Sequence, residues 1–233
     1  MSSLTIDRHA HTSVRHGTRF SLLRLPESVR LSTEFIFTIK RTNEMPGRND
    51  TRASDPIPIE LSMDFYMRFK KELGIWGGLV SDFRYPKFVM EDHMRKGDSR
   101  AAVVVAARTD VMVAAYTDEM DCVAMLRFPK WVNELYPVEI GTRLTTVNTY
   151  TWLKDGRADD LIPGPSSSGQ FGNFFPIIAE FIAANPWVAE ARKKDIDESE
   201  WQRTTELAAE YRKKNGTRWR DGNPFKSKTP AKW

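Results

Sequence analysis

The sequence has only one cysteine, Cys122, among its 233 residues, so no disulfide can form within the chain. This excludes the secreted domains that depend on a disulfide framework. One cysteine and four histidines also exclude a cysteine-rich structural zinc site. We therefore expect a reducing intracellular location, in the mitochondrial matrix or the cytoplasm, and predict neither a metal nor a cofactor.

Long apolar runs are also missing. The longest, residues 101–107, has the length of a β-strand, whereas a helix that crosses a bilayer needs about 20 apolar residues. The first apolar cluster, residues 20–25, is short and contains Arg24, which does not fit a secretory signal. We expect no transmembrane segment.

Charge is distributed unevenly along the chain. The net charge is +4, with +3 on the first 33 residues and +7 on the last 23, which leaves −6 on the residues between. Basic ends on an acidic body predict that the ends bind an acidic partner or another subunit. Residues 1–18 are rich in Ser, Thr, Arg and His, which resembles either a mitochondrial targeting segment or an unstructured arm.

Hydrophobic patterning predicts a sheet in the middle of the chain. Residues 100–128 are typical of three antiparallel strands joined by two polar turns. Further strands are expected at residues 20–25, 34–41 and 142–152. Residues 57–73 fit both a strand and a helix; we favour a short strand to Leu61 followed by a helix.

Four other segments are predicted to be helical. They are residues 129–136, residues 173–184, a helix that starts at Asn185-Pro186, and residues 197–214, closed by Asn215-Gly216. The expected fold is α+β, an antiparallel sheet of five or six strands with helices on one face. The chain divides into an extended arm at 1–18, a globular domain at 19–196, a C-terminal helix at 197–214 and an extended basic and aromatic tail at 215–233.

The C-terminal tail is the main candidate for partner binding. It alternates basic residues with aromatic ones, and an exposed tryptophan costs solubility unless it docks on something. Basic groups neutralise phosphates or carboxylates, while rings stack on bases or fill pockets. The candidate residues are Arg212, Lys213, Lys214, Arg218, Trp219, Arg220, Phe225, Lys226 and Trp233.

A serine-rich loop is the candidate for anion binding. Ser166, Ser167, Ser168 and Gly169 stand before the helix expected at 173–184, and a helix start offers free N–H groups to a phosphate or carboxylate. The loop lacks the lysine and the spacing of a P-loop. The alternative interpretation is an ordinary flexible surface loop.

Other polar residues are interpreted structurally. Asp118, Glu119 and Asp121 fall in a predicted hairpin turn, where aspartate is favoured for the turn itself. We interpret Cys122 as a small buried hydrophobe, because an acidic turn does not activate a thiol. His93 is interpreted as a surface histidine. No residue is predicted to be catalytic.

Three functions compete on these observations. The leading hypothesis is a non-catalytic accessory or structural subunit of a larger intracellular assembly, which docks on other protein subunits through its basic, aromatic ends. The alternative is a nucleic-acid-associated protein of the ribosomal type, with RNA as the partner. A second alternative is a small-molecule enzyme that uses the Ser166–Gly169 loop as its anion site.

Overall fold

A computed structural model describes residues 59–74 and 87–226 of the chain. These residues belong to one compact unit, Asn43–Trp233. The expected arm at 1–18, the strands expected at 20–25 and 34–41, and Trp233 lie outside the described residues.

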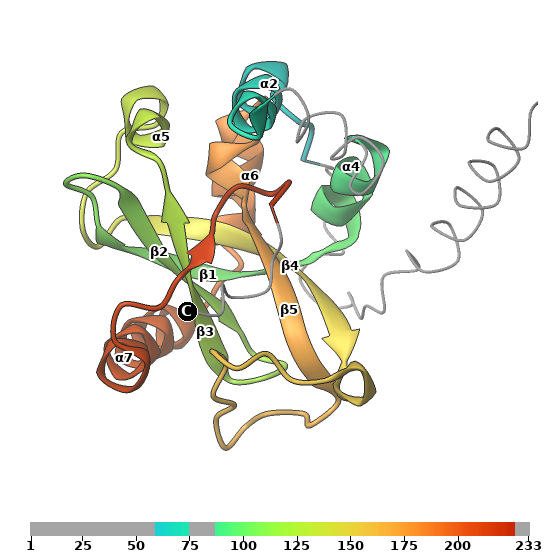
Figure 1. Ribbon diagram of the computed structural model, residues 1–233, viewed down its shortest axis with the longest axis vertical. Coiled ribbons are helices and arrows are strands. Elements are labelled where there is room, and N and C mark those ends of the chain that lie inside the picture. The colour runs from blue at the N-terminus through green and yellow to red at the C-terminus, as the bar shows by residue number, and fades with distance from the viewer. Residues whose placement is uncertain (1–58, 75–86, 227–233) are drawn as a thin grey trace, which may run out of the picture. The chain divides into compact units, whose positions relative to one another are not determined.

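The centre of the unit is a curled sheet of six strands in the order β5-β4-β1-β2-β3-β6 (Figure 1). Neighbouring strands run antiparallel except β3 and β6, which are parallel, so the sheet is mixed and not purely antiparallel as expected. The strands are β1 (Asp98–Ala106), β2 (Val111–Thr117), β3 (Cys122–Phe128), β4 (Arg143–Trp152), β5 (Phe171–Ile178) and β6 (Arg220–Asp221). The predicted meander and the strand at 142–152 are confirmed.

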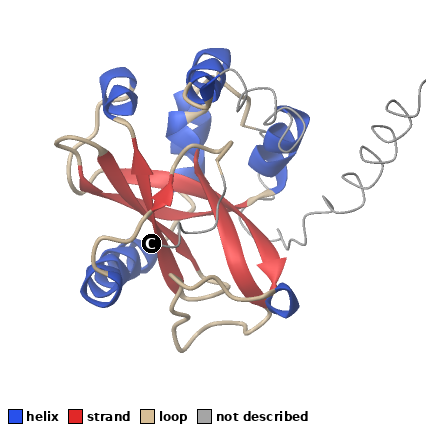
Figure 2. Cartoon of the chain, viewed as in Figure 1, coloured by secondary structure: helices blue, strands red, loops and turns tan. Residues whose placement is uncertain are grey.

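Most of the predicted helices are present (Figure 2). The N–H of Phe65 donates to the Ser62 side chain and that of Trp187 to the Asn185 side chain, so both polar residues cap helix starts. The last helix, α7 (Glu198–Asn215), ends at Gly216, whose φ of 60° suits glycine. The helices are α2 (Met63–Lys71), α4 (Lys87–Lys96), α5 (Lys130–Leu135), α6 (Pro186–Lys193), α7 (Glu198–Asn215), and the short 3-10 turns η2 (Leu153–Asp155) and η3 (Ala179–Phe181).

Helices cover both faces of the sheet, not one face as expected. Successive residues of a strand point to opposite faces of the sheet, so the side chains of Val113 and Ala114 of β2 lie on different faces. Val113 shares a core with Phe69 of α2 and Val132 of α5. Ala114 packs with Leu207 and Ala208 of α7. The position of α7 across the sheet from α2 and α5 is visible in Figure 1.

The prediction of a helix at residues 173–184 is wrong. Residues 171–178 form β5, which pairs along β4, and a 3-10 turn follows. The segment is rich in phenylalanine and isoleucine, which fit a pleated, buried surface. Pro176 is tolerated because β5 is an edge strand.

One buried arginine, Arg220, forms an ion pair and also connects the two edges of the curled sheet. Arg220 of β6 donates through Nε and Nη2 to both carboxylate oxygens of Asp160, each at 2.7 Å. Its Nη1 donates to the carbonyl of Phe174 on β5, the opposite edge strand, at 2.9 Å. Arg220 is 1% exposed and Asp160 is 0% exposed, so neither charge reaches solvent. The segment predicted as an extended tail is therefore built into the domain, and Asn223 and Phe225 beyond Arg220 also contact it.

Removing one member of this pair should strongly destabilise the domain. We expect Arg220→Ala to lower the free energy of unfolding by about 3–5 kcal/mol, because Asp160 is left as a buried, uncompensated charge. Urea denaturation measures the change.

Two variants test that explanation. The matched control Arg218→Ala removes an exposed arginine two residues away and should stay within about 0.5 kcal/mol of the parent chain. The double change Arg220→Met with Asp160→Leu removes both charges and should recover much of the lost stability. An Arg220→Ala variant as stable as the Arg218→Ala control would contradict this account.

Candidate functional site

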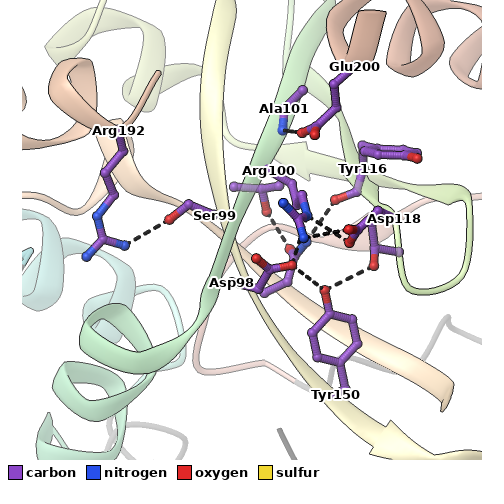
Figure 3. A network of polar contacts seen from close by, with 12 residues as sticks. Asp98, Ser99, Arg100, Ala101, Tyr116, Asp118, Tyr150, Arg192 and Glu200 are labelled. Carbon is purple, nitrogen blue, oxygen red and sulfur yellow. Dashed lines mark hydrogen bonds and ion pairs between the residues drawn. The ribbon is translucent and has the colours of Figure 1, made fainter. Parts of the chain in front are cut away.

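A network of charged and polar side chains, buried except for Asp118, lies around β1 (Figure 3). Arg100 of β1 donates to the Asp118 carboxylate at 2.7 and 2.5 Å and also pairs with Asp98 at 2.9 Å. The hydroxyl of Thr117 donates to that of Tyr150, which donates to Asp98 at 3.0 Å. The chain thus supplies a partner for each charge in this network.

The surroundings of this network argue against catalysis. Burial raises the pKa of Tyr150 well above its ordinary value, and the Asp98 charge raises it further, so the phenol stays protonated and is not a base. Burial alone would lower the pKa of Arg100, but Asp98 and Asp118 raise it overall. Asp98, Arg100 and Tyr150 are at most 3% exposed, so a reactant does not reach them. We interpret the network as structural.

The same strand is held from its other side. Arg192 of α6 donates to the Ser99 hydroxyl at 2.9 Å, and Glu200 of α7 accepts from the backbone N–H of Ala101 at 2.7 Å. Figure 3 shows these two contacts around β1. Ser99 and Ala101 therefore anchor β1 to α6 and α7.

The acidic hairpin turn has the predicted turn role and also binds other parts of the chain. Asp121 has a φ of 47°, which aspartate tolerates in turns. Arg203 of α7 donates to both of its carboxylate oxygens, at 3.0 and 2.9 Å. Gly164 passes so close that a Cβ there would lie 2.1 Å from Asp121 Oδ2. The carboxylate therefore joins the turn, α7 and the serine loop, and is not a free acid.

The serine loop lacks the physical basis on which its anion site was predicted. The strand β5 follows it, so no helix start points at Ser166–Gly169. Its backbone N–H groups already donate, that of Ser168 to the Glu119 carbonyl at 2.8 Å and that of Ser166 to Asp121 at 3.4 Å. These acceptors belong to the acidic turn, which repels an anion.

Two further side chains with reactive groups, His93 and Cys122, are buried. His93 is 0% exposed, and the interpretation as a surface histidine is wrong. Its ring nitrogens lie 2.8 Å from the Val147 carbonyl and 3.3 Å from the Thr149 hydroxyl, because α4 packs on β4. Cys122 is buried, as expected.

The basic tail divides into an internal and an external part. Arg220 is inside the fold, the ring of Phe225 lies 5.1 Å from that of Tyr66, and Lys226 pairs with Asp221 at 2.8 Å. Trp219 is half-buried. The exposed candidates are Arg212, Lys213, Lys214 and Arg218.

Two of these external residues, Arg212 and Arg218, line an open groove of about 720 Å³. The guanidinium of Arg127 lies over the Trp219 ring, 4.5 Å from its centroid, and pairs with Asp110 at 2.5 Å. Arg108 and Arg218, also in the lining, are exposed and have no ion pair within the described residues. Positive charge at this groove therefore exceeds negative charge.

A second groove of about 660 Å³ continues the first along α7. The two share Val105, Ile140 and Arg212 in their linings. Ile140 is 68% exposed, which is unusual for a large apolar side chain beside a groove. We call this combined surface the α7 groove. Sequence reasoning found Arg212, Arg218 and Trp219 but missed the rest, because the hairpin, the loop at 140 and α7 are far apart in the chain.

The buried thiol of Cys122 gives a direct test of how β3 is packed in the domain. Burial raises the pKa of Cys122 to about 12; the nearby Arg220 charge lowers it, and Asp160 and Asp121 act in the opposite direction to Arg220. We expect a disulfide reagent at pH 8 to leave the folded chain unlabelled and to label one thiol per chain in denaturant. Labelling of the native chain at the rate of the unfolded one would contradict the burial of β3.

Among residues 59–74 and 87–226 there is neither a group of metal-ligating side chains nor a helix long and apolar enough to cross a membrane. Comparison of the chain with protein-family models, with curated proteins and with solved structures found no match. The site must therefore be interpreted from its own geometry, which gives one strong candidate, the α7 groove.

Proposed function

We propose that the chain is a non-catalytic subunit of a larger intracellular protein assembly and docks on a neighbouring subunit through the basic surface at the end of α7. One observation carries the proposal. Arg108, Arg212 and Arg218 surround a groove with apolar walls, and none of them pairs with a carboxylate of the described residues. Six other arginines do so, namely Arg95, Arg100, Arg127, Arg143, Arg203 and Arg220. Arg68 and Arg157 are exposed and also lack such a pair among the described residues, but they line neither part of the α7 groove.

This difference between arginines is informative because an arginine that stabilises its own fold usually has its charge satisfied there. Arg212 donates to the Val105 carbonyl, which orients the side chain but does not neutralise it. Its charge remains available to a carboxylate outside the domain. Arginine is also the basic residue best suited to bidentate contacts with carboxylates at interfaces.

RNA is the second candidate partner, and Trp219 is the observation that favours it. A half-buried ring among arginines resembles a stacking platform beside phosphate contacts. However, the Arg127 guanidinium already covers one face of that ring. The neighbouring lining is aliphatic, with Val103, Val105 and Ile140, which suits a peptide better than a base.

The remaining expectations have weaker support. The enzyme hypothesis needs the Ser166–Gly169 loop to hold an anion, although two of its N–H groups face the acidic turn. An intracellular location, mitochondrial or cytoplasmic, is part of the proposal and rests on the single cysteine and the composition of residues 1–18.

A charge-reversal experiment tests the proposed docking. Deleting residues 215–233 is unsuitable, because it removes Arg220 and Asn223 from the interior. The test variant is instead Arg212→Glu with Lys213→Glu and Arg218→Glu, all exposed positions. We expect this triple variant, purified gently from the native source, to lose its partner subunits and keep the parent's thermal unfolding midpoint.

The matched control reverses three exposed charges elsewhere, Arg68→Glu with Lys71→Glu and Arg157→Glu. It should keep the partners. A parent chain that purifies as a lone monomer would contradict the proposal, as would a triple variant that retains every partner. A nuclease-sensitive particle with the absorbance of nucleic acid would favour RNA instead, and its binding should then fall steeply with salt.

A further inference from the structure

The α7 groove has the dimensions of a binding site for an extended chain. Its lining follows α7 from Gln202 to Arg212, a path of about 15 Å at the helical rise. An extended peptide advances about 3.3 Å per residue, so this arm takes roughly five residues. The adjoining part, beside Arg108 and Arg218, has a similar volume, about 720 Å³ against 660 Å³, and extends the track beyond these five residues.

The chemistry of the groove changes across its width. The outer face of the sheet contributes apolar side chains, Val103 and Val105 of β1 and Met112 of β2, and the exposed Ile140 stands beside them. Arg108, Arg212 and Arg218 border the same track with positive charge. Two carboxylates also line the groove. That of Asp110 is neutralised by Arg127, at 2.7 and 2.5 Å, and that of Glu206, in the arm along α7, lies 3.8 Å from Arg203.

We propose that the α7 groove binds an extended acidic segment of a partner protein in which carboxylate side chains alternate with aliphatic ones. The inference rests on the proposed function and names the chemistry of the partner. In an extended segment, successive side chains point to opposite sides. The aliphatic set contacts Ile140 and the sheet, while the carboxylates reach the arginines.

Charge complementarity argues for this occupant over RNA. Carboxylates and phosphates both suit arginine, but the apolar floor contributes only if the ligand has aliphatic side chains to bury. A nucleic acid would leave Ile140 and Val105 uncovered by apolar groups. A second copy of this chain is the other alternative, and the test separates it from the acidic segment.

Fluorescence anisotropy on the full chain tests the inference. The probe is a fluorescein-labelled ten-residue peptide of alternating glutamate and leucine, used below the concentration at which it self-associates. We expect saturable binding that weakens with salt. The affinity for the peptide should fall at least ten-fold in the double variant Arg108→Glu with Arg218→Glu, and at least ten-fold in the single variant Ile140→Asp. The matched control, Arg68→Glu with Arg157→Glu, should bind like the parent.

Four outcomes would overturn the inference. They are no binding of the peptide to the parent chain, equal binding of a decaglutamate that lacks leucine, stronger binding of a ten-nucleotide single-stranded RNA, and a concentration-dependent dimer of the chain that Ile140→Asp abolishes. Because Ile140 is exposed, its change to aspartate should leave the unfolding midpoint unchanged, and Ile140→Ser is a milder second variant.

The native purification separates this inference from the proposed function. If Ile140→Asp keeps its partner subunits while the triple variant at Arg212, Lys213 and Arg218 loses them, docking stands and the groove is not its site. If the triple variant also keeps them, both proposals fail.

Discussion

The buried pair of Arg220 and Asp160 is the interaction on which the arrangement of this chain depends. It joins β6 to the opposite edge of the sheet through the Phe174 carbonyl and holds the segment after α7 in place. Arg220 points inward, and its neighbour Trp219 packs against the outer layer beside Arg127. The same strand that stabilises the interior therefore positions the external basic surface. A tail free in solution would hold neither Trp219 nor Arg218 beside the β1–β2 hairpin.

Charge is used in two ways in this molecule. Inside the domain, Arg100 and Arg220 are matched to aspartates, and Arg203 at the periphery is matched to Asp121. Such pairs fix the register of strands and turns and leave little charge for chemistry. At the end of α7, by contrast, Arg108 and Arg218 lack carboxylate partners within the described residues. Charge left uncompensated on a surface with an apolar floor is what a binding site for an acidic partner requires.

The sequence predicts the local features of this fold, but it does not predict the contacts between residues that are far apart in the chain. The meander, the caps at Ser62 and Asn185 and the stop at Gly216 follow from short-range patterns and are confirmed. Residues 171–178 form a short apolar run, whose periodicity does not separate a buried strand from a helix. The partner of Arg220 lies 60 residues away, and the two-residue strand β6 has no pattern of its own. For the site, tail composition predicted that basic and aromatic residues dock on a partner, and this stays a prediction; it did not predict that Arg220 and Phe225 bind their own domain.

The central claim is that the unpaired arginines of the α7 groove lie in an interface. Arginine-specific modification by phenylglyoxal, mapped by mass spectrometry, tests it on the native assembly and on the isolated chain. The account predicts that Arg108, Arg212 and Arg218 are protected in the assembly, while the exposed Arg68 and Arg157 react equally in both states. Equal reactivity of the groove arginines in the two states, or protection confined to Arg68 and Arg157, would contradict it.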